Sequence, residues 1–166
     1  MHATILAETE ARFRADPAAA QSRPAVSAVL AEGRAQLSAG PFTWQADLPL
    51  AIGGQNGAPS PTAYLLGALA GCGVAFLHDT LAPQFGVKID GITAVARCSA
   101  DARGLLGIDE IPSDLGALEL DIEVSTTSAA DRVEAMFAAW RERCPIYLAL
   151  LKPQSIALTT GTAVAA

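Results

Sequence analysis

The most reactive side chains in this 166-residue sequence belong to three cysteines, Cys72, Cys98 and Cys144. Their number is odd and their spacing wide, so they predict neither a disulfide framework nor a zinc site of paired C-x-x-C type. A zinc site made from Cys72, His78 and Cys144 has no motif spacing in its favour, and we expect no metal and no other cofactor. In a reducing compartment such cysteines are either core residues or reactive thiols.

The surroundings of two of these cysteines favour chemistry. Gly71 and Gly73 flank Cys72 within an apolar run, and each glycine costs a helix about 1 kcal/mol relative to alanine. This cost suggests that a packed helix or a ligand approaches the backbone closely. Cys144 precedes Pro145, where a helix must break, and free N–H groups at the start of the next helix can stabilise a thiolate.

Each of the three cysteines also has an ordinary interpretation. A buried cysteine behaves as a small hydrophobic residue, which would suffice to explain Cys72. Cys144 could be a residue at a kink whose thiol is incidental, and Cys98 alternates within a predicted strand and is interpreted as structural.

His78 lies six positions after Cys72, off its helical face, so it is not expected to act as a base. A surface or N-terminal packing role is expected for both histidines.

Composition and charge exclude several classes of protein. The chain is 51% hydrophobic and only 17% charged, which predicts one folded domain rather than disorder. A net charge of −6 argues against binding to nucleic acid. The apolar run from Tyr64 to Leu77 is shorter than the roughly 20 residues of a membrane span. The first residues lack the pattern of a signal peptide, so we expect a cytoplasmic protein.

The periodicity of apolar residues predicts an α+β fold with a mixed or antiparallel sheet. A short helix and a linker come first, followed by a meander of three strands and a long helix opened by Ser60 and Pro61. Two strands, an amphipathic helix capped by Thr127 or Ser128, a short helix opened by Pro145 and a last strand complete the order. The expected helices cover residues 4–13, 62–81, about 128–143 and 145–151, and the expected strands 26–30, 35–39, 42–48, 87–100, 117–125 and 154–160.

The long helix is apolar on every side until His78 and Asp79. A helix without a polar face must be buried all round. One small domain can hardly surround such a helix, so we expect a second subunit to help cover it.

The sequence resembles the OsmC/Ohr family of bacterial hydroperoxide-reducing proteins. The resemblance rests on Ser60-Pro61, Tyr64-Leu65-Leu66 and the run from Ala68 to Cys72 after a Gly53-Gly54 loop, and on Arg141 to Pro145 followed by Leu148 and Leu151. It extends from about Val26 onward, which divides the chain into an N-terminal helix and linker (residues 1–24) and an OsmC-like domain (residues 25–166). It implies an intertwined homodimer with two long central helices and a mostly antiparallel, six-stranded type of sheet from each chain.

The resemblance also implies roles for three residues. Cys72 would be the peroxidatic thiol that attacks an organic hydroperoxide, and Cys144 would resolve the resulting sulfenic acid as a disulfide, which a cellular dithiol then reduces. Arg34, on the first hairpin, would be the cation that makes Cys72 reactive. The family's peroxidases orient this arginine with a glutamate ten residues before the cysteine, where this chain has Thr62. Glu32 and Asp47 are the carboxylates that could take its place.

Two further hypotheses remain open beside the thiol peroxidase. In one, the chain is an OsmC-like stress-associated or small-ligand-binding protein that keeps the fold and pocket but lacks efficient turnover. In the other, all three thiols are core residues. Thr62 in place of the family's glutamate favours the stress-associated or ligand-binding protein. The presence of both Cys72 and Cys144 favours the peroxidase.

Overall fold

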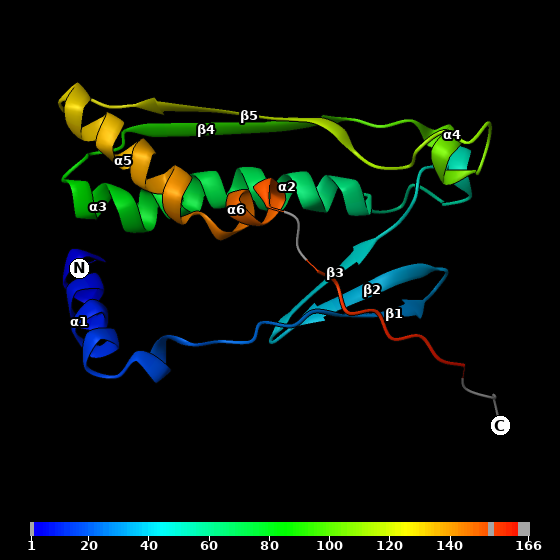
Figure 1. Cartoon of the computed structure of the whole chain (residues 1–166), viewed down its shortest axis with the longest axis horizontal. Coiled ribbons are helices and arrows are strands. Elements are labelled where there is room, and N and C mark those ends of the chain that lie inside the picture. Colours follow the sequence, from blue (N-terminus) through cyan, green and yellow to red (C-terminus); the bar gives the residue numbers. More distant parts are fainter. Residues whose placement is uncertain (1, 153–154, 163–166) are drawn as a thin grey trace.

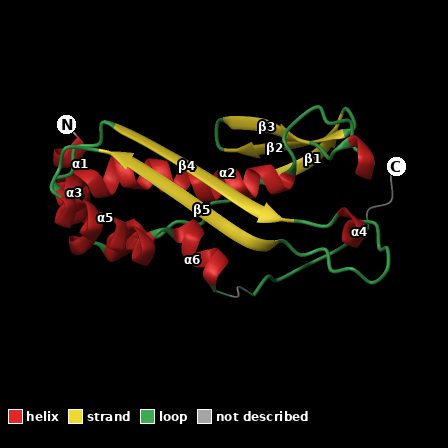
Figure 2. Cartoon of the chain, turned by 90° about the horizontal axis from the view of Figure 1, so that it is seen from above, coloured by secondary structure: helices red, strands yellow, loops and turns green. Residues whose placement is uncertain are grey.

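The architecture is α+β, with a long central helix between two small antiparallel sheets (Figures 1 and 2). The computed structural model describes residues 2–152 and 155–162. The helices are α1 (His2–Ala15), α2 (Pro61–Ala75), α3 (Ala82–Phe85), α4 (Ala102–Leu105), α5 (Ala130–Arg143) and α6 (Pro145–Leu151). The strands are β1 (Ser27–Ala31), β2 (Arg34–Ala39), β3 (Phe42–Ala46), β4 (Gly91–Ser99) and β5 (Gly116–Ser125).

The predicted meander of three strands is confirmed. β1, β2 and β3 pair antiparallel in chain order, with Ala31 opposite Arg34 and Ala39 opposite Phe42. Glu32 and Gly33 join β1 to β2 with φ angles of 52° and 76°. Two successive positive φ values match the twist of a tight hairpin, and glycine is the residue that adopts them most readily. The hairpin therefore fixes Arg34 at the first position of β2.

The long helix is also confirmed, although it extends beyond the predicted residues 62–81. The Ser60 hydroxyl accepts a hydrogen bond from the Ala63 N–H, and Pro61 occupies the first turn. α2 continues through a π-helical stretch (Phe76–Leu81) into α3, so that Pro61–Phe85 forms one helix of 25 residues. Gly86, with a φ of 62°, ends it.

By length and composition this 25-residue helix could cross a membrane, whereas the apolar run in the sequence is too short to do so. Its most apolar stretch of 18 residues has a mean hydropathy of 1.5, and 28% of that stretch is buried within the chain. The core helix of a soluble protein meets the same criterion. We assign it as a core helix because Leu77 and Leu81 are fully buried and because His78 and Asp79 pair at 2.7 Å along its length.

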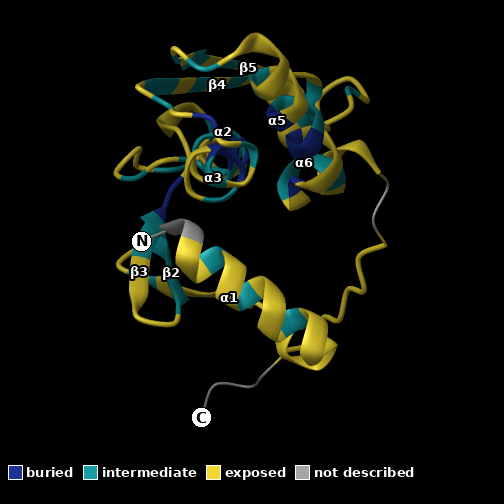
Figure 3. Ribbon diagram, turned by 90° about the vertical axis from the view of Figure 1, so that its left-hand side faces the viewer, coloured by how far each residue is buried: buried dark blue, intermediate teal, exposed yellow. Residues whose placement is uncertain are grey.

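The core lies where α5 crosses the second half of the long helix, and Figure 3 shows segments coloured as buried on both elements. Leu77, Leu81 and Met136 are fully buried there, and Trp140 is 4% exposed. β4 and β5 cover the helix from the other side. At Gly73 a Cβ would lie 3.1 Å from the Ile122 side chain, so the glycine allows this close packing of helix on sheet.

The first half of α2 is not covered within the chain. Gly67, Ala68 and Gly71 are exposed, and an apolar cavity of about 710 Å³ separates this part of the helix from the inner face of the β1–β3 sheet. Trp44, Leu37 and other apolar residues line that cavity. One chain therefore does not provide the burial on all sides that the sequence predicts for this helix.

Two local predictions are wrong. Residues 155–162 form no strand, and Ile156 and Leu158 are 87% and 82% exposed; residue 154 lies outside the described residues. A strand forms by pairing with a neighbouring strand, and this segment pairs with none among the described residues. The N-cap of α5 is Ala129, because the Ser128 hydroxyl accepts a hydrogen bond from the Lys88 N–H at 2.8 Å instead of capping the helix. The described residues accordingly contain five of the six expected strands.

Candidate active site

The fold brings together two of the three cysteines. The Sγ atoms of Cys72 and Cys144 lie 3.1 Å apart, although 72 positions separate them in the chain. Cys72 lies on α2, and Cys144 lies at the joint between α5 and α6. Cys98 lies on β4 and makes no contact with either of them among the interactions of the described residues. A small relative movement of α2 and the joint would allow a disulfide, whose sulfurs are about 2.05 Å apart.

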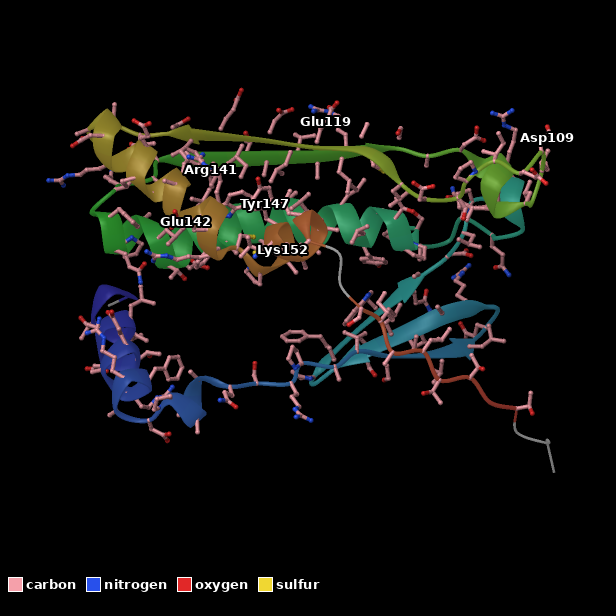
Figure 4. The ribbon with its side chains drawn as sticks, viewed as in Figure 1. Asp109, Glu119, Arg141, Glu142, Tyr147 and Lys152 are labelled. Atoms are coloured by element: carbon pink, nitrogen blue, oxygen red, sulfur yellow. The ribbon has the colours of Figure 1, made fainter. Side chains whose placement is uncertain are left out.

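Pro145 creates the joint that carries Cys144. Cys144 has a ψ of 112°, outside the helical range, as expected of the residue before a proline. Its N–H donates to the Trp140 carbonyl at 2.9 Å and so closes α5, while its carbonyl accepts from the Leu148 N–H at 3.0 Å and so opens α6. The short helix that the sequence predicts from Pro145 to Leu151 is confirmed. Figure 4 shows this region, with Arg141 and Glu142 at the end of α5 and Tyr147 at the start of α6.

The two thiols differ in exposure. Cys144 is completely buried in the core together with Met136 and Trp140, and the Tyr147 ring packs on Trp140 with a centroid separation of 5.0 Å. Cys72 is partly exposed at the edge of this core. Of the pair, Cys72 is therefore the thiol that a substrate could reach, whereas Cys144 is shielded from solvent.

Burial raises the pKa of Cys72 to about 11, and the contact with Cys144 acts in the same direction. The backbone N–H of Ile146, in the first turn of α6, hydrogen-bonds to Cys72 and opposes this rise. At neutral pH a thiol with this pKa is ionised in only about one molecule in ten thousand. Within a single chain Cys72 is thus a weak nucleophile and needs a nearby cation.

Arg34 contacts Asp47 and Gln55 rather than a thiol among the described residues. Its Nε lies 3.5 Å from Asp47 Oδ2, and its Nη2 donates to Gln55 Oε1 at 3.3 Å. None of its recorded interactions in the described part of the chain involves a cysteine. Glu32 is exposed in the hairpin turn and forms no ion pair with Arg34 among the described residues. Of the two carboxylates considered from the sequence, Asp47 is the one in contact with Arg34.

Sequence reasoning missed two partners of Arg34 in the loop between β3 and α2. Besides Gln55, Gly57 packs directly against the guanidinium, since a Cβ there would lie 2.3 Å from Arg34 Nη2. The only signal was the glycine-rich composition of this loop, which indicates flexibility but not contact with a particular side chain. Thr62, at the position of the family's glutamate, is half-buried at the start of α2.

The described residues contain no group of three histidine, cysteine, aspartate or glutamate side chains that could hold a metal ion. His78 is exposed and pairs with its neighbour Asp79 rather than approaching Cys72. The site that the fold assembles consists of the two thiols.

The fold and the family match define an OsmC-like protein. The family model described as OsmC-like protein matches residues 54–159, and the chain belongs to this family. This confirms the resemblance and the fold class predicted from the sequence. The match begins at residue 54, so the proposed division between residues 1–24 and 25–166 stays a prediction.

Solved structures share the fold at low sequence identity. The OsmC-like protein of Mycoplasma pneumoniae is 20% identical with a TM-score of 0.66, over 79% of this chain and 89% of that one. A putative osmotic stress induced and detoxification response protein of Psychrobacter arcticus is 18% identical (TM-score 0.60; 77% and 88% covered). An organic hydroperoxide resistance protein OsmC of Legionella pneumophila is 17% identical (TM-score 0.55; 78% and 89% covered). No curated protein matches the chain.

Proposed function

We propose that the protein is a thiol peroxidase that reduces organic hydroperoxides in the cytoplasm. The single observation that carries the proposal is the 3.1 Å separation of the Cys72 and Cys144 sulfurs, one partly exposed and one buried. Membership of the OsmC-like family and the fold shared with a protein named for organic hydroperoxide resistance support it.

The reaction uses the two thiols in sequence. The Cys72 thiolate attacks the distal oxygen of the hydroperoxide and breaks the O–O bond; the alkoxide takes a proton and leaves as alcohol, and Cys72 becomes a sulfenic acid. The Cys144 thiol then displaces water from this sulfenic acid and forms the disulfide. Altogether one hydroperoxide and two thiols give one alcohol, one water and one disulfide. A dithiol reductant restores the starting state by thiol–disulfide exchange.

A second protomer would complete this site. Arg34 begins β2 and pairs with Asp47, which directly follows β3, and with Gln55 rather than with a thiol among the described residues. Gly67 and Ala68 of α2 line an apolar cavity of about 710 Å³. In an intertwined homodimer a second long helix would fill this space. The β1–β3 sheet of one protomer would then bring its Arg34 to the Cys72 of the other, and the guanidinium would lower the pKa of that thiol.

Peroxide consumption with thiol titration tests the proposal. Reduced protein mixed with an organic hydroperoxide should lose two thiols for each equivalent consumed, and hydrogen peroxide serves as the comparison for a bulky alkyl hydroperoxide. Cys72→Ser should abolish consumption, with Cys98→Ser as the matched control that keeps it. Retention of all thiols over hours in the wild-type protein would refute the proposal.

The raised pKa of Cys72 favours a second candidate function. If no cation reaches Cys72, the protein would be an OsmC-like stress-associated protein or a binder of small hydrophobic ligands, without efficient peroxidase turnover. Saturable binding of such a ligand by a protein whose thiols do not react with hydroperoxide would favour this function over the peroxidase.

A further inference from the structure

The arginine of this chain is held in place although the helix glutamate of the family's peroxidases is replaced by Thr62. Arg34 Nε is buried and lies 3.5 Å from Asp47 Oδ2, an ion-pair contact without a hydrogen bond from Nε. We propose that Asp47 is the residue that positions Arg34 for the thiol reaction, and that it does so from the loop after β3 rather than from the start of α2. The inference rests on the proposed function, and it identifies a positioning residue for it.

Asp47 is itself firmly anchored. Its side chain is 5% exposed, and its carboxylate accepts hydrogen bonds from the N–H groups of Leu48 at 2.8 Å, Gly57 at 2.9 Å and Gln55 at 3.2 Å. A buried carboxylate with several donors resists protonation, and the hydrogen bonds, that of Gly57 above all, lower the pKa of Asp47 despite its burial. Asp47 therefore presents a negative charge of fixed position to Arg34 at neutral pH.

The loop from Leu48 to Gly57 closes the other side of the guanidinium. Gln55 accepts a hydrogen bond from Arg34 Nη2, and at Gly57 even a methyl group would overlap the guanidinium atoms. The same loop is wrapped around Asp47 by its three N–H groups. Asp47 thus fixes Arg34 twice, directly by charge and indirectly through the loop that packs against it.

The segment that carries Asp47 is hydrogen-bonded to the start of the long helix. The Asp47 N–H donates to the Pro59 carbonyl at 3.2 Å, and the Tyr64 hydroxyl donates to the Gln45 carbonyl at 2.5 Å. Asp47 therefore lies between the strand that precedes it and the first turn of α2, where Thr62 is located. A carboxylate from the loop can in this way replace one from the helix.

Arg34→Ala, Asp47→Asn and the double variant test the inference through the rate at which an organic hydroperoxide oxidises Cys72. Glu32→Gln is the matched control, because Glu32 is the exposed carboxylate two residues from Arg34. We expect both single variants to slow oxidation at least tenfold and to shift its pH profile upward. The double variant should be no slower than Arg34→Ala, and Glu32→Gln should react within twofold of wild type. The test depends on this non-additivity, because the effects of substituting two residues that act through one another do not add.

A second measurement keeps the inference separate from the peroxidase activity. The NMR chemical shift of the Arg34 Nε–H should change in Asp47→Asn, which removes the charge beside Nε, and stay as in the wild type in Glu32→Gln. If Asp47→Asn slows the Arg34→Ala variant as much as it slows the wild type, or leaves the Nε–H signal unchanged, Asp47 does not act through Arg34. If the Nε–H signal responds to Asp47→Asn in this way but the wild type reduces no hydroperoxide, the peroxidase is refuted whereas the contact of Asp47 with Arg34 stands.

Discussion

Oxidation of the thiol pair should stabilise the protein by an amount that follows from the loop it closes. A bond between Cys72 and Cys144 would close a loop of 72 positions. The chain-entropy model of disulfide stabilisation gives about 4 kcal/mol for a loop of this length at 25 °C, which is an upper bound if closing the remaining distance strains the α5–α6 joint. Because Cys144 is already buried against Cys72, we expect little strain and most of this gain.

Urea unfolding of reduced and hydroperoxide-treated protein measures the effect. Both forms are compared at equal protomer concentration, because association changes apparent stability. The treated form should be more stable by about 2–4 kcal/mol, Cys98→Ser should show the same gain, and Cys144→Ser should show none. Equal stability of the two forms after the loss of two thiols would refute the assigned pairing.

Three further predictions concern the role of Cys144, the dimer and the core. In Cys144→Ser, hydroperoxide should leave a sulfenic acid on Cys72, which mass spectrometry detects as its dimedone adduct. A disulfide between Cys72 and Cys98 instead would contradict the role of Cys144. A Cβ at Gly67 would have no neighbour within 4 Å among the described residues. Gly67→Leu should therefore leave a monomer intact but lower the dimer fraction, measured by light scattering, if the dimer packs through α2. A wild-type protein that is monomeric would contradict the dimer. Met136 is fully buried in the core with Leu77 and Leu81, so Met136→Ala should lower the free energy of unfolding by about 2–5 kcal/mol. A loss below 1 kcal/mol in urea unfolding would contradict this packing.

Local patterns predicted most of the elements because each depends on neighbouring residues. Ser60-Pro61 starts the long helix, and Pro145 sets the break that carries Cys144. The alternation from Gly116 to Ser125 appears as β5. The last strand could not be predicted in the same way, since Ile156 and Leu158 alternate correctly but a strand also needs a free edge beside it.

The site depends on contacts that no local pattern contains. Nothing in the spacing of Cys72 and Cys144 shows that their sulfurs meet, and only the resemblance to a family suggested the pair. The same holds for Asp47. Its importance lies in three backbone N–H groups that converge on it from a glycine-rich loop, and a sequence does not show where N–H groups point.

The pKa of Cys72, measured by the pH dependence of its alkylation in wild-type and Arg34→Ala protein, tests the central claim most directly. Both proteins carry Cys98→Ser, so that of the two remaining thiols only Cys72 is partly exposed. The account predicts a value well below 11 in the wild-type protein, where a partner's guanidinium faces the thiol, and a rise toward 11 when Arg34 is removed. A wild-type value near 11 that Arg34→Ala leaves unchanged would contradict it.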